Sequence, residues 1–327
     1  MKNKFVAILA IVAALLFAGC KEKDKQAVTK AGNGEWRPSG TVTMIVAYKP
    51  GSGTDNTARV LSAYAEKYIG QKITIKNIEG DSGSIGWTEL ANSKPDGLTL
   101  GFINLPTFCA NIIDHLGSYT IDSIEPIANH VMETSVVLVS EKSPFNNLQE
   151  LVDFAKANPG KLKASTNGKM ASNHIGAQLL SRSANFKYEA VHFSSTADEL
   201  LALRNGEVDF AVAKVADFVP FESEVRLLAA FDTDRIPEYS YVPTLGEFGF
   251  YPQWYGSARC IVAPKGTPKE VIDFYAKAFK DIMDDLDYKL ASESAHMTTA
   301  YKDPAATSAL ISQQYDFCAN TLKSIFE

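Results

Sequence analysis

The chain has 327 residues, a length that fits one large or two medium-sized domains rather than a single small module. Hydrophobic residues make up 46% and charged residues 21%, a balance that allows a sizeable core and excludes wholesale disorder. The 32 Lys and Arg against 38 Asp and Glu give a formal net charge of -6, which argues against nucleic-acid binding.

The first twenty residues have the pattern of a bacterial export signal. Lys2 and Lys4 give a basic start, residues 5–17 are apolar, and small residues precede Cys20. The apolar run is shorter than a membrane span and suits the hydrophobic region of a signal peptide. The residues before Cys20 resemble a lipobox, which implies cleavage there and lipidation of Cys20. We therefore expect residues 1–20 to anchor an extracytoplasmic protein to a membrane.

Strands and helices alternate along the body, which follows a Lys-, Glu-, Gly- and Ala-rich stretch at residues 21–39 that we expect to be a flexible linker. In chain order the patterns of the first half predict a strand at 41–48, a helix from Asp55 to a C-cap at Gly70, strands at 72–78 and 98–103 around a helix at 87–92, a strand at 136–140, and a helix at 148–158. The second half follows with a strand at 163–166, a helix at 172–183, a strand at 188–193, a helix at 197–205, and strands at 208–213 and 225–231. After a segment at 254–264, helices are predicted at 268–286 and 304–325. Single helices between strands are typical of βαβ units around a mainly parallel sheet.

Three polar loops each join a predicted strand to the helix that follows. The first, GSGTD at residues 51–55, lacks the Gly-Lys-Ser/Thr of a P-loop and the third glycine of a dinucleotide fingerprint. A tight turn with Thr54 or Asp55 as N-cap is an equal alternative there. Strand ends and helix N-termini in this arrangement favour a small anionic ligand held by neutral donors. The candidate ligand-binding residues are Tyr48, Gly51, Ser52, Gly53, Thr54 and Asp55 in the first loop, Thr166, Asn167, Gly168, Ser172, Asn173 and His174 in the second, and Ser194 and Ser195 in the third.

Constellations typical of enzymes and metal sites are missing from the sequence. It has no G-x-S-x-G, no H-E-x-x-H and no C-x-x-C, and its five histidines have no metal-like spacing. We expect the acidic run around Asp284 to be a solvated helix face. For His174, a solvated or capping role is the alternative to ligand binding. Cys109, Cys260 and Cys318 leave one disulfide or three free thiols equally open. The sequence thus predicts no catalytic residues, no metal and no cofactor.

Residues 41–100 resemble the opening of the substrate-binding proteins of tripartite tricarboxylate transporters. Later segments, HFSSTADELLALRNGEVDFAVA, VPTLGEFGF and WYGSARCIVAPKGTPKEVIDFYAKAF, are similar too, so the resemblance runs with gaps from about residue 41 to the C-terminus. The chain departs from the family pattern at Ser52, Lys49 and Leu98, where the family has Gly, Pro and an aromatic residue. The residues that carry the resemblance in the opening stretch are Tyr48, Pro50, Gly51, Gly53, Asp55, Ala58, Arg59, Gly70, Gln71, Asn77, Gly80, Gly83, Ile85, Gly86, Pro95, Asp96, Gly97, Thr99 and Leu100.

The resemblance implies an α/β, two-lobed periplasmic-binding-protein fold of type II, with two crossover strands and a ligand cleft between the lobes. Carried onto this chain, lobe 1 is residues 40–134 plus 255–327 and lobe 2 is residues 135–254. The family holds a carboxylate between the lobes through its first two strand-to-helix loops, here residues 48–55 and 166–174. Closure of the cleft then couples ligand binding to shape.

The function that this resemblance implies is an extracytoplasmic solute-binding lipoprotein, not an enzyme. It would capture a di- or tricarboxylate or related organic acid and deliver it, as a monomer, to one large and one small permease subunit. Two alternatives stay open: a receptor for an amino acid or other zwitterion, with Asp55 facing the ammonium group, and a sensor component that presents its ligand to a signalling protein.

Overall fold

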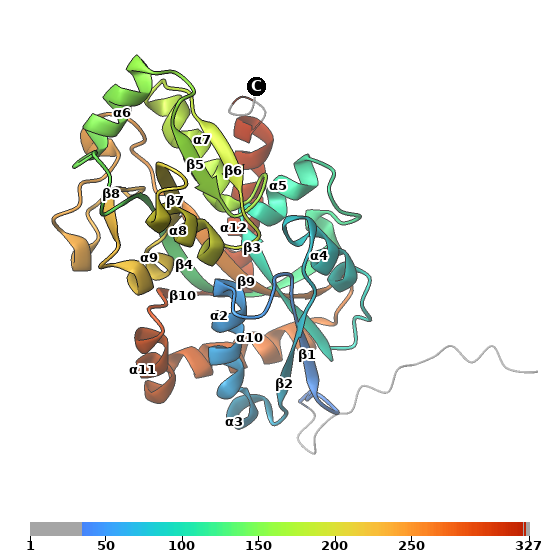
Figure 1. The fold of residues 1–327 in the computed structure, drawn as a ribbon. Helices are drawn as coiled ribbons and strands as arrows, with labels where there is room; N and C mark the ends of the chain where they lie inside the picture. The colour runs from blue at the N-terminus through green and yellow to red at the C-terminus, as the bar shows by residue number, and fades with distance from the viewer. Residues whose placement is uncertain (1–34, 323, 325–327) are drawn as a thin grey trace, which may run out of the picture.

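The computed structural model describes residues 35–322 and residue 324 (Figure 1). The expected signal peptide, Cys20 and most of the expected linker lie outside the described residues. Within the linker's last part, Trp36 is 5% exposed and packs edge-on against Phe274 and Tyr275. The folded body therefore begins a few residues earlier than the sequence predicts.

One mixed sheet runs through both lobes, and its strand order is β2-β1-β3-β9-β4-β7-β5-β6, with β8 and β10 also paired to β4. In Figure 1 the strands from β1 to β3 lie in one lobe and those from β5 to β8 in the other. The strands are β1 (Val42–Val46), β2 (Ile73–Asn77), β3 (Thr99–Leu105), β4 (Ile124–Ser140), β5 (Lys163–Thr166), β6 (Glu189–His192), β7 (Phe210–Lys214), β8 (Val225–Ala230), β9 (Gly256–Pro264) and β10 (Thr299–Lys302).

The long strand β4 carries the chain from one lobe to the other. Up to Thr134, which lies opposite Gly256, it pairs with β9; from Ser135, which lies opposite Lys214, it pairs with β7 and β8. A strand that crosses over and a strand that returns run in opposite directions, so β4 and β9 are antiparallel to each other and to their neighbours. The predicted parallel pairing holds only for the outer strands, β1 with β2 and β3, and β5 with β6 and β7.

Helices cover the sheet on both sides, and most lie close to their predicted positions. The helices are α2 (Gly53–Ala63), α3 (Ala65–Ile69), α4 (Ser84–Ala91), α5 (Thr107–Ile113), α6 (Leu148–Ala157), α7 (Ser172–Ser183), α8 (Thr196–Asn205), α9 (Val215–Phe218), α10 (Lys269–Asp284), α11 (Leu286–Ser294) and α12 (Pro304–Phe317). Gly70 ends α3 with a φ of 78°, the left-handed cap that the sequence predicts. The single helix predicted at 268–286 is interrupted, because Asp285 leaves α10 and caps the N-terminus of α11.

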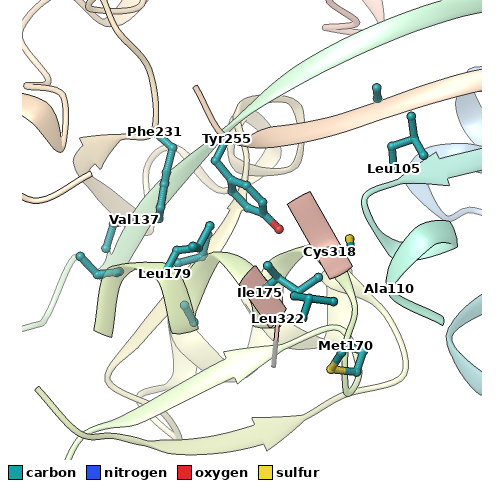
Figure 2. Close-up of a cluster of buried hydrophobic side chains, with 14 of the residues drawn as sticks. Leu105, Ala110, Val137, Met170, Ile175, Leu179, Phe231, Tyr255, Cys318 and Leu322 are labelled. Atoms are coloured by element: carbon teal, nitrogen blue, oxygen red, sulfur yellow. The ribbon is translucent and has the colours of Figure 1, made fainter. Parts of the chain in front are cut away.

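Alternate residues of β1 face two different cores, as expected for a strand that is covered on both sides. Met44 packs toward α2 and α10, whereas Ile45 packs toward α4 and α5. The second of these cores continues across both lobes behind the cleft. Leu105 of lobe 1, Ile175 of lobe 2 and Cys318 of the C-terminal segment belong to this one cluster and are labelled in Figure 2, so this segment helps to join the lobes.

Cys109, Cys260 and Cys318 are buried free thiols, which decides the question that the sequence left open. None of the helices in the described part of the chain is long and apolar enough to cross a membrane.

Candidate functional site

A cavity of about 430 Å³ lies between the lobes, within the size range of small-molecule sites. Both lobes contribute to its wall through the ends of strands and the starts of helices. The polar and charged residues that line it are Tyr48, Lys49, Ser52, Thr54, Asn56, Thr57, Asn104, Thr107, Glu133, Ser257 and Arg259 from lobe 1, and Asn167, Ser172, Asn173, Ser194, Ser195, Thr196, Asp198, Lys214 and Asp217 from lobe 2.

The N-terminus of α2 forms the lobe 1 side of this cavity. Ser52 is the N-cap, and its hydroxyl accepts a hydrogen bond from the backbone N–H of Asp55 at 3.3 Å. The alternative that Thr54 or Asp55 caps the helix is therefore wrong. Helix geometry leaves the N–H groups of the first turn without carbonyl partners inside the helix. Gly53 and Thr54 line the cavity and bring two of these N–H groups to its wall.

Two more helices begin at the same cavity from lobe 2. Ser172 and Asn173 of the first turn of α7 line it, and so does Ser195, the N-cap of α8. Each helix N-terminus carries a partial positive charge, which favours an anion nearby. Three helix starts around one cavity therefore favour a ligand with negative charge.

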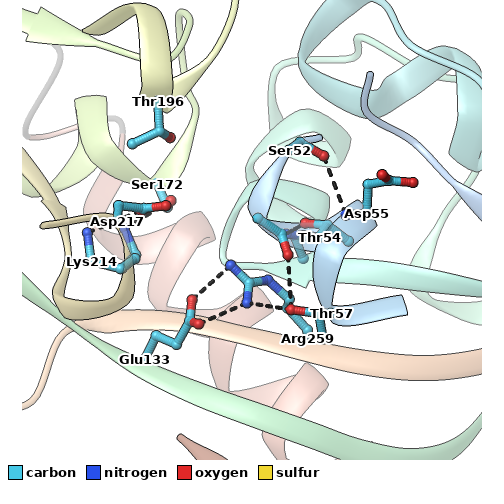
Figure 3. A network of polar contacts seen from close by, with 12 residues as sticks. Ser52, Thr54, Asp55, Thr57, Glu133, Ser172, Thr196, Lys214, Asp217 and Arg259 are labelled. Atoms are coloured by element: carbon cyan, nitrogen blue, oxygen red, sulfur yellow. Dashed lines mark hydrogen bonds and ion pairs between the residues drawn. The ribbon is translucent and has the colours of Figure 1, made fainter. Parts of the chain in front are cut away.

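A buried ion pair forms the floor between the lobes (Figure 3). Arg259 of β9 contacts both oxygens of Glu133 of β4, at 2.8 Å from Nη1 to Oε1 and 2.7 Å from Nη2 to Oε2. Nη1 also donates to Thr57 Oγ1 at 2.9 Å. The two side chains are 6% and 2% exposed, so water screens this pair weakly.

A second set of charges comes from the end of β7 and the turn after it. Lys214 Nζ donates to Asn173 Oδ1 at 2.6 Å and to Ser172 Oγ at 3.2 Å. The orientation of the Asn173 amide is fixed from the other side, because its Nδ2 donates to the buried Glu199 at 2.8 Å. Burial lowers the pKa of Lys214 to about 8 and raises the pKa of Asp217.

The lobes touch each other directly at the cavity rim. Lys49 of the first loop reaches across to Asp198 of α8 at 3.0 Å and to Ser194 at 3.4 Å. Thr107 Oγ1 accepts a hydrogen bond from the N–H of Ser172 at 3.1 Å. The structure is therefore a closed form, in which groups of both lobes surround one volume.

The structure brings most of the predicted binding residues to this cavity. The residues on its wall are Tyr48, Gly51, Ser52, Gly53, Thr54, Asn167, Ser172, Asn173, Ser194 and Ser195. Three residues of the second loop lie behind the wall instead: Thr166 bonds His192, Gly168 lies beside Ser82 of lobe 1, and His174 Nδ1 accepts from the N–H of Met170. Burial lowers the pKa of His174 to about 3, so this imidazole is neutral near pH 7.

Asp55 also lies away from the cavity, against the prediction that it contacts the ligand. Its side chain is 1% exposed and accepts hydrogen bonds from the Gly51 N–H at 2.8 Å, Arg59 Nε at 2.8 Å and Asn77 Nδ2 at 2.9 Å. Figure 3 shows it turned away from the charged groups around Arg259. Asp55 therefore holds the first loop in shape. Its donors are Gly51 of that loop, Arg59 one turn further along α2 and Asn77 at the end of β2, and they keep the side chain on the outer side of α2.

This role predicts that Asp55→Ala destabilises the ligand-free protein by about 1–3 kcal/mol, because three donors lose a buried acceptor. Burial alone would raise the pKa of Asp55, but hydrogen bonds from Arg59, Gly51 and Asn77 outweigh it and lower the pKa. The stabilisation is then complete above the ordinary Asp pKa and is lost as pH falls through the lowered value. Urea unfolding from pH 7 to pH 2 measures both effects. The exposed Glu66→Ala is the control, and equal stability of the two variants would contradict this role.

The predicted binding residues include none of the six charged residues that line the cavity, namely Lys49, Glu133, Asp198, Lys214, Asp217 and Arg259. A usable signal exists for two of them. Lys214 ends the apolar strand FAVA, and Arg259 interrupts the otherwise apolar strand GSARCIVAP. A charge inside a fully buried strand needs a partner or a ligand, so such positions point to a site.

A family model described as "Tripartite tricarboxylate transporter family receptor" matches residues 57–324. The chain belongs to this family. A relative from Cupriavidus necator, named "UPF0065 protein in gbd 5'region", is 27% identical over 98% of this chain and 95% of its own length. Two solved structures, each 25% identical to this chain, share its fold. The periplasmic binding protein BugD has a TM-score of 0.81, and the match covers 88% of this chain and 98% of BugD. MatC of Rhodopseudomonas palustris with bound malate has a TM-score of 0.79, and the match covers 89% of this chain and 100% of MatC.

The family confirms the two-lobed periplasmic-binding-protein fold and the prediction that this protein is a solute receptor rather than an enzyme. It also places the receptor outside the cytoplasm. In residues 35–322 and 324, no group of three or more His, Cys, Asp or Glu side chains is arranged to hold a metal ion.

Proposed function

We propose that this receptor captures a small organic carboxylate in the cavity between its lobes and delivers it to a tripartite transporter. The observation that carries the proposal is the convergence of α2, α7 and α8, whose N-termini all border the one cavity together with Lys214 and Arg259. The likeness to malate-bound MatC supports the same ligand chemistry.

The carboxylate would be held mainly by neutral groups. The N–H groups of Gly53 and Thr54 and the hydroxyl of Ser52 are donors that the cavity offers, whereas the Ser195 hydroxyl already donates to Asp198. Each exposed helix N-terminus stabilises an anion by about 0.3–1 kcal/mol, so several together bind it without a full counter-charge at every oxygen. Affinity built in this way is moderate, which suits a protein that must release its ligand.

Release follows from opening of the cleft, because only the closed form makes both sets of contacts. The first loop belongs to lobe 1, whereas Ser172, Asn173 and Ser195 belong to lobe 2. A ligand that contacts both lobes binds the closed form more tightly than the open form. This difference in affinity sets how far the ligand shifts the population toward the closed form. The Lys49–Asp198 ion pair at the rim would have to break on opening.

The proposal predicts that carboxylates raise the melting temperature of residues 21–327. A ligand at 100 times its dissociation constant adds about 2.7 kcal/mol of stability. A thermal-shift screen of mono-, di- and tricarboxylates, with neutral alcohols and sugars as controls, measures this, and calorimetry then gives the affinities. Stabilisation by neutral solutes alone would overturn the carboxylate assignment, and mass spectrometry of the denatured protein would identify any ligand retained from expression.

We further propose that the receptor is a lipoprotein whose lipidated Cys20 holds it at the membrane beside one large and one small permease subunit. The basic, apolar and small-residue pattern of residues 1–20 supports the anchor. A tethered receptor stays at high local concentration near its permease, which favours delivery of the bound ligand.

Replacing Cys20 by Ala should therefore move the protein from the membrane fraction to the soluble fraction of the cell. The neighbouring Lys21→Ala is the matched control and should remain with the membrane. Fractionation followed by immunoblotting measures the distribution, and a membrane-bound Cys20→Ala protein would contradict the anchor.

A further inference from the structure

Two opposite charges on the lobe 2 wall of the cavity, Lys214 and Asp217, form no direct ion pair, although they lie close enough to affect each other's pKa. Lys214 Nζ bonds only neutral atoms, Asn173 Oδ1 and Ser172 Oγ. Asp217 accepts one hydrogen bond, from the Lys214 N–H to Oδ2 at 3.3 Å. Among the residues that the structure describes, no ion pair within 4.0 Å includes either side chain, whereas Arg259 is paired with Glu133 and Lys49 with Asp198.

The free oxygen of Asp217 faces the middle of the cleft. A methyl group on the Cα of Gly53 would lie 3.6 Å from Asp217 Oδ1 and 2.9 Å from Arg259 Nη2. Since Gly53 begins α2 on the opposite lobe, Asp217 reaches across to the helix start that we assign to the ligand carboxylate. A ligand seated there meets an anionic oxygen and several positive groups within a few ångströms.

Lys214 and Arg259 favour the charged form of Asp217 in part, but a buried carboxylate without a direct ion pair remains costly. The raised pKa of Asp217, which burial causes, expresses that cost. A second carboxylate of the ligand would add repulsion, whereas a cationic group of the ligand would remove the cost. The cavity therefore carries a specificity element that neutral helix N-termini alone do not supply.

We propose that the ligand of this receptor is a small zwitterion of the α-amino acid type, whose ammonium group pairs with Asp217 while its carboxylate lies against Lys214 and the N-terminus of α2. This inference rests on the proposed function, because it takes the same cavity as the carboxylate site. It assigns Asp217 as the residue that distinguishes amino acids from hydroxy acids and plain dicarboxylates.

Three matched series of ligands test the assignment, since the members of each differ only in the group on the carbon beside a carboxylate. The series are succinate, malate and aspartate; glutarate, 2-hydroxyglutarate and glutamate; and propionate, lactate and alanine. Isothermal titration calorimetry on residues 21–327 gives the affinity ratios. In at least one series we expect the amine to bind at least about tenfold more tightly than the other two members, as a charge-assisted contact does.

Asp217→Asn tests whether that preference comes from this side chain. The amide keeps the size and can still accept the Lys214 N–H, but it removes the negative charge. We expect the preference for the amine to fall by about tenfold or more, while the hydroxy acid binds as well as before or better. Glu222→Gln removes an exposed charge a few residues further along the chain and outside the cavity, and it should leave the ratios unchanged.

The outcomes separate this inference from the proposed function. If the unsubstituted or the hydroxy acid binds as tightly as the amine, or more tightly, in all three series, the zwitterion assignment is overturned, whether or not binding takes up a proton. The proposed carboxylate receptor is then unaffected. If Asp217→Asn still prefers the amine, the ammonium group does not pair with Asp217, and the assignment is overturned. Binding of no carboxylate at all overturns both. If Asp217→Asn does not fold, the wild-type ratios still decide between a zwitterion and a plain carboxylate ligand.

Discussion

Arg259→Met is expected to lower the free energy of unfolding by about 3–5 kcal/mol, because it leaves a buried carboxylate without its counter-charge. Glu133 is 2% exposed, and both of its oxygens face the guanidinium of Arg259 at 2.7 and 2.8 Å. The two residues lie on the adjacent strands β4 and β9, whose backbone pairing holds the side chains in place. Urea unfolding of the ligand-free protein at pH 7 measures the loss.

A double variant shows whether the cost comes from the stranded charge. Arg259→Met with Glu133→Leu removes both members, and a buried pair replaced by apolar residues is often neutral or stabilising. We expect the double variant to recover most of the stability that the single variant loses. A double variant as unstable as Arg259→Met would show instead that packing, or the contact with Thr57, carries the energy.

Gly53→Val is expected to weaken ligand binding by about 100-fold or more, equivalent to about 2.7 kcal/mol, and to lower the stability of the ligand-free protein through its contact with Arg259. The first side-chain carbon would approach Arg259 Nη2 to 2.9 Å, and Arg259 cannot move away easily because Glu133 holds it. The extra methyl groups of Val would then fill the space between Gly53 and Asp217, where the ligand and the closing lobe meet. Calorimetric titration with the best ligand from the screen measures the loss.

Gly40→Val is the matched control, since nothing lies within 4 Å of the corresponding position at Gly40. It should bind the ligand as tightly as the unmodified receptor. If Gly53→Val also retained full affinity, the ligand would have to lie elsewhere in the cleft, and the assignment of the α2 N-terminus to the carboxylate would fail.

The sequence was most informative where structure depends on neighbouring residues. The helix predicted at 172–183 is α7, and Gly70 takes the left-handed conformation that its place after a helical pattern predicts. The polar loops at the ends of predicted strands indicated the correct edge of the sheet for the site. Strand direction and loop position follow from the order of strands and helices along the chain. The first half of β4 escaped notice, since Glu125, Asn129 and His130 interrupt its apolar pattern.

The order of elements, the polar loops and the family resemblance were thus determined by the sequence itself. Which residues face the ligand was decided only by the tertiary structure. Asp55 belongs to a loop that the sequence identified correctly, yet its side chain points to the outer side of α2, where Arg59 and Asn77 bind it. Glu133 and Arg259 lie 126 positions apart and meet because two antiparallel strands pair at the junction of the lobes. Tertiary packing sets which side of a helix faces the ligand and which distant strands pair. Neither can be read from a local sequence pattern.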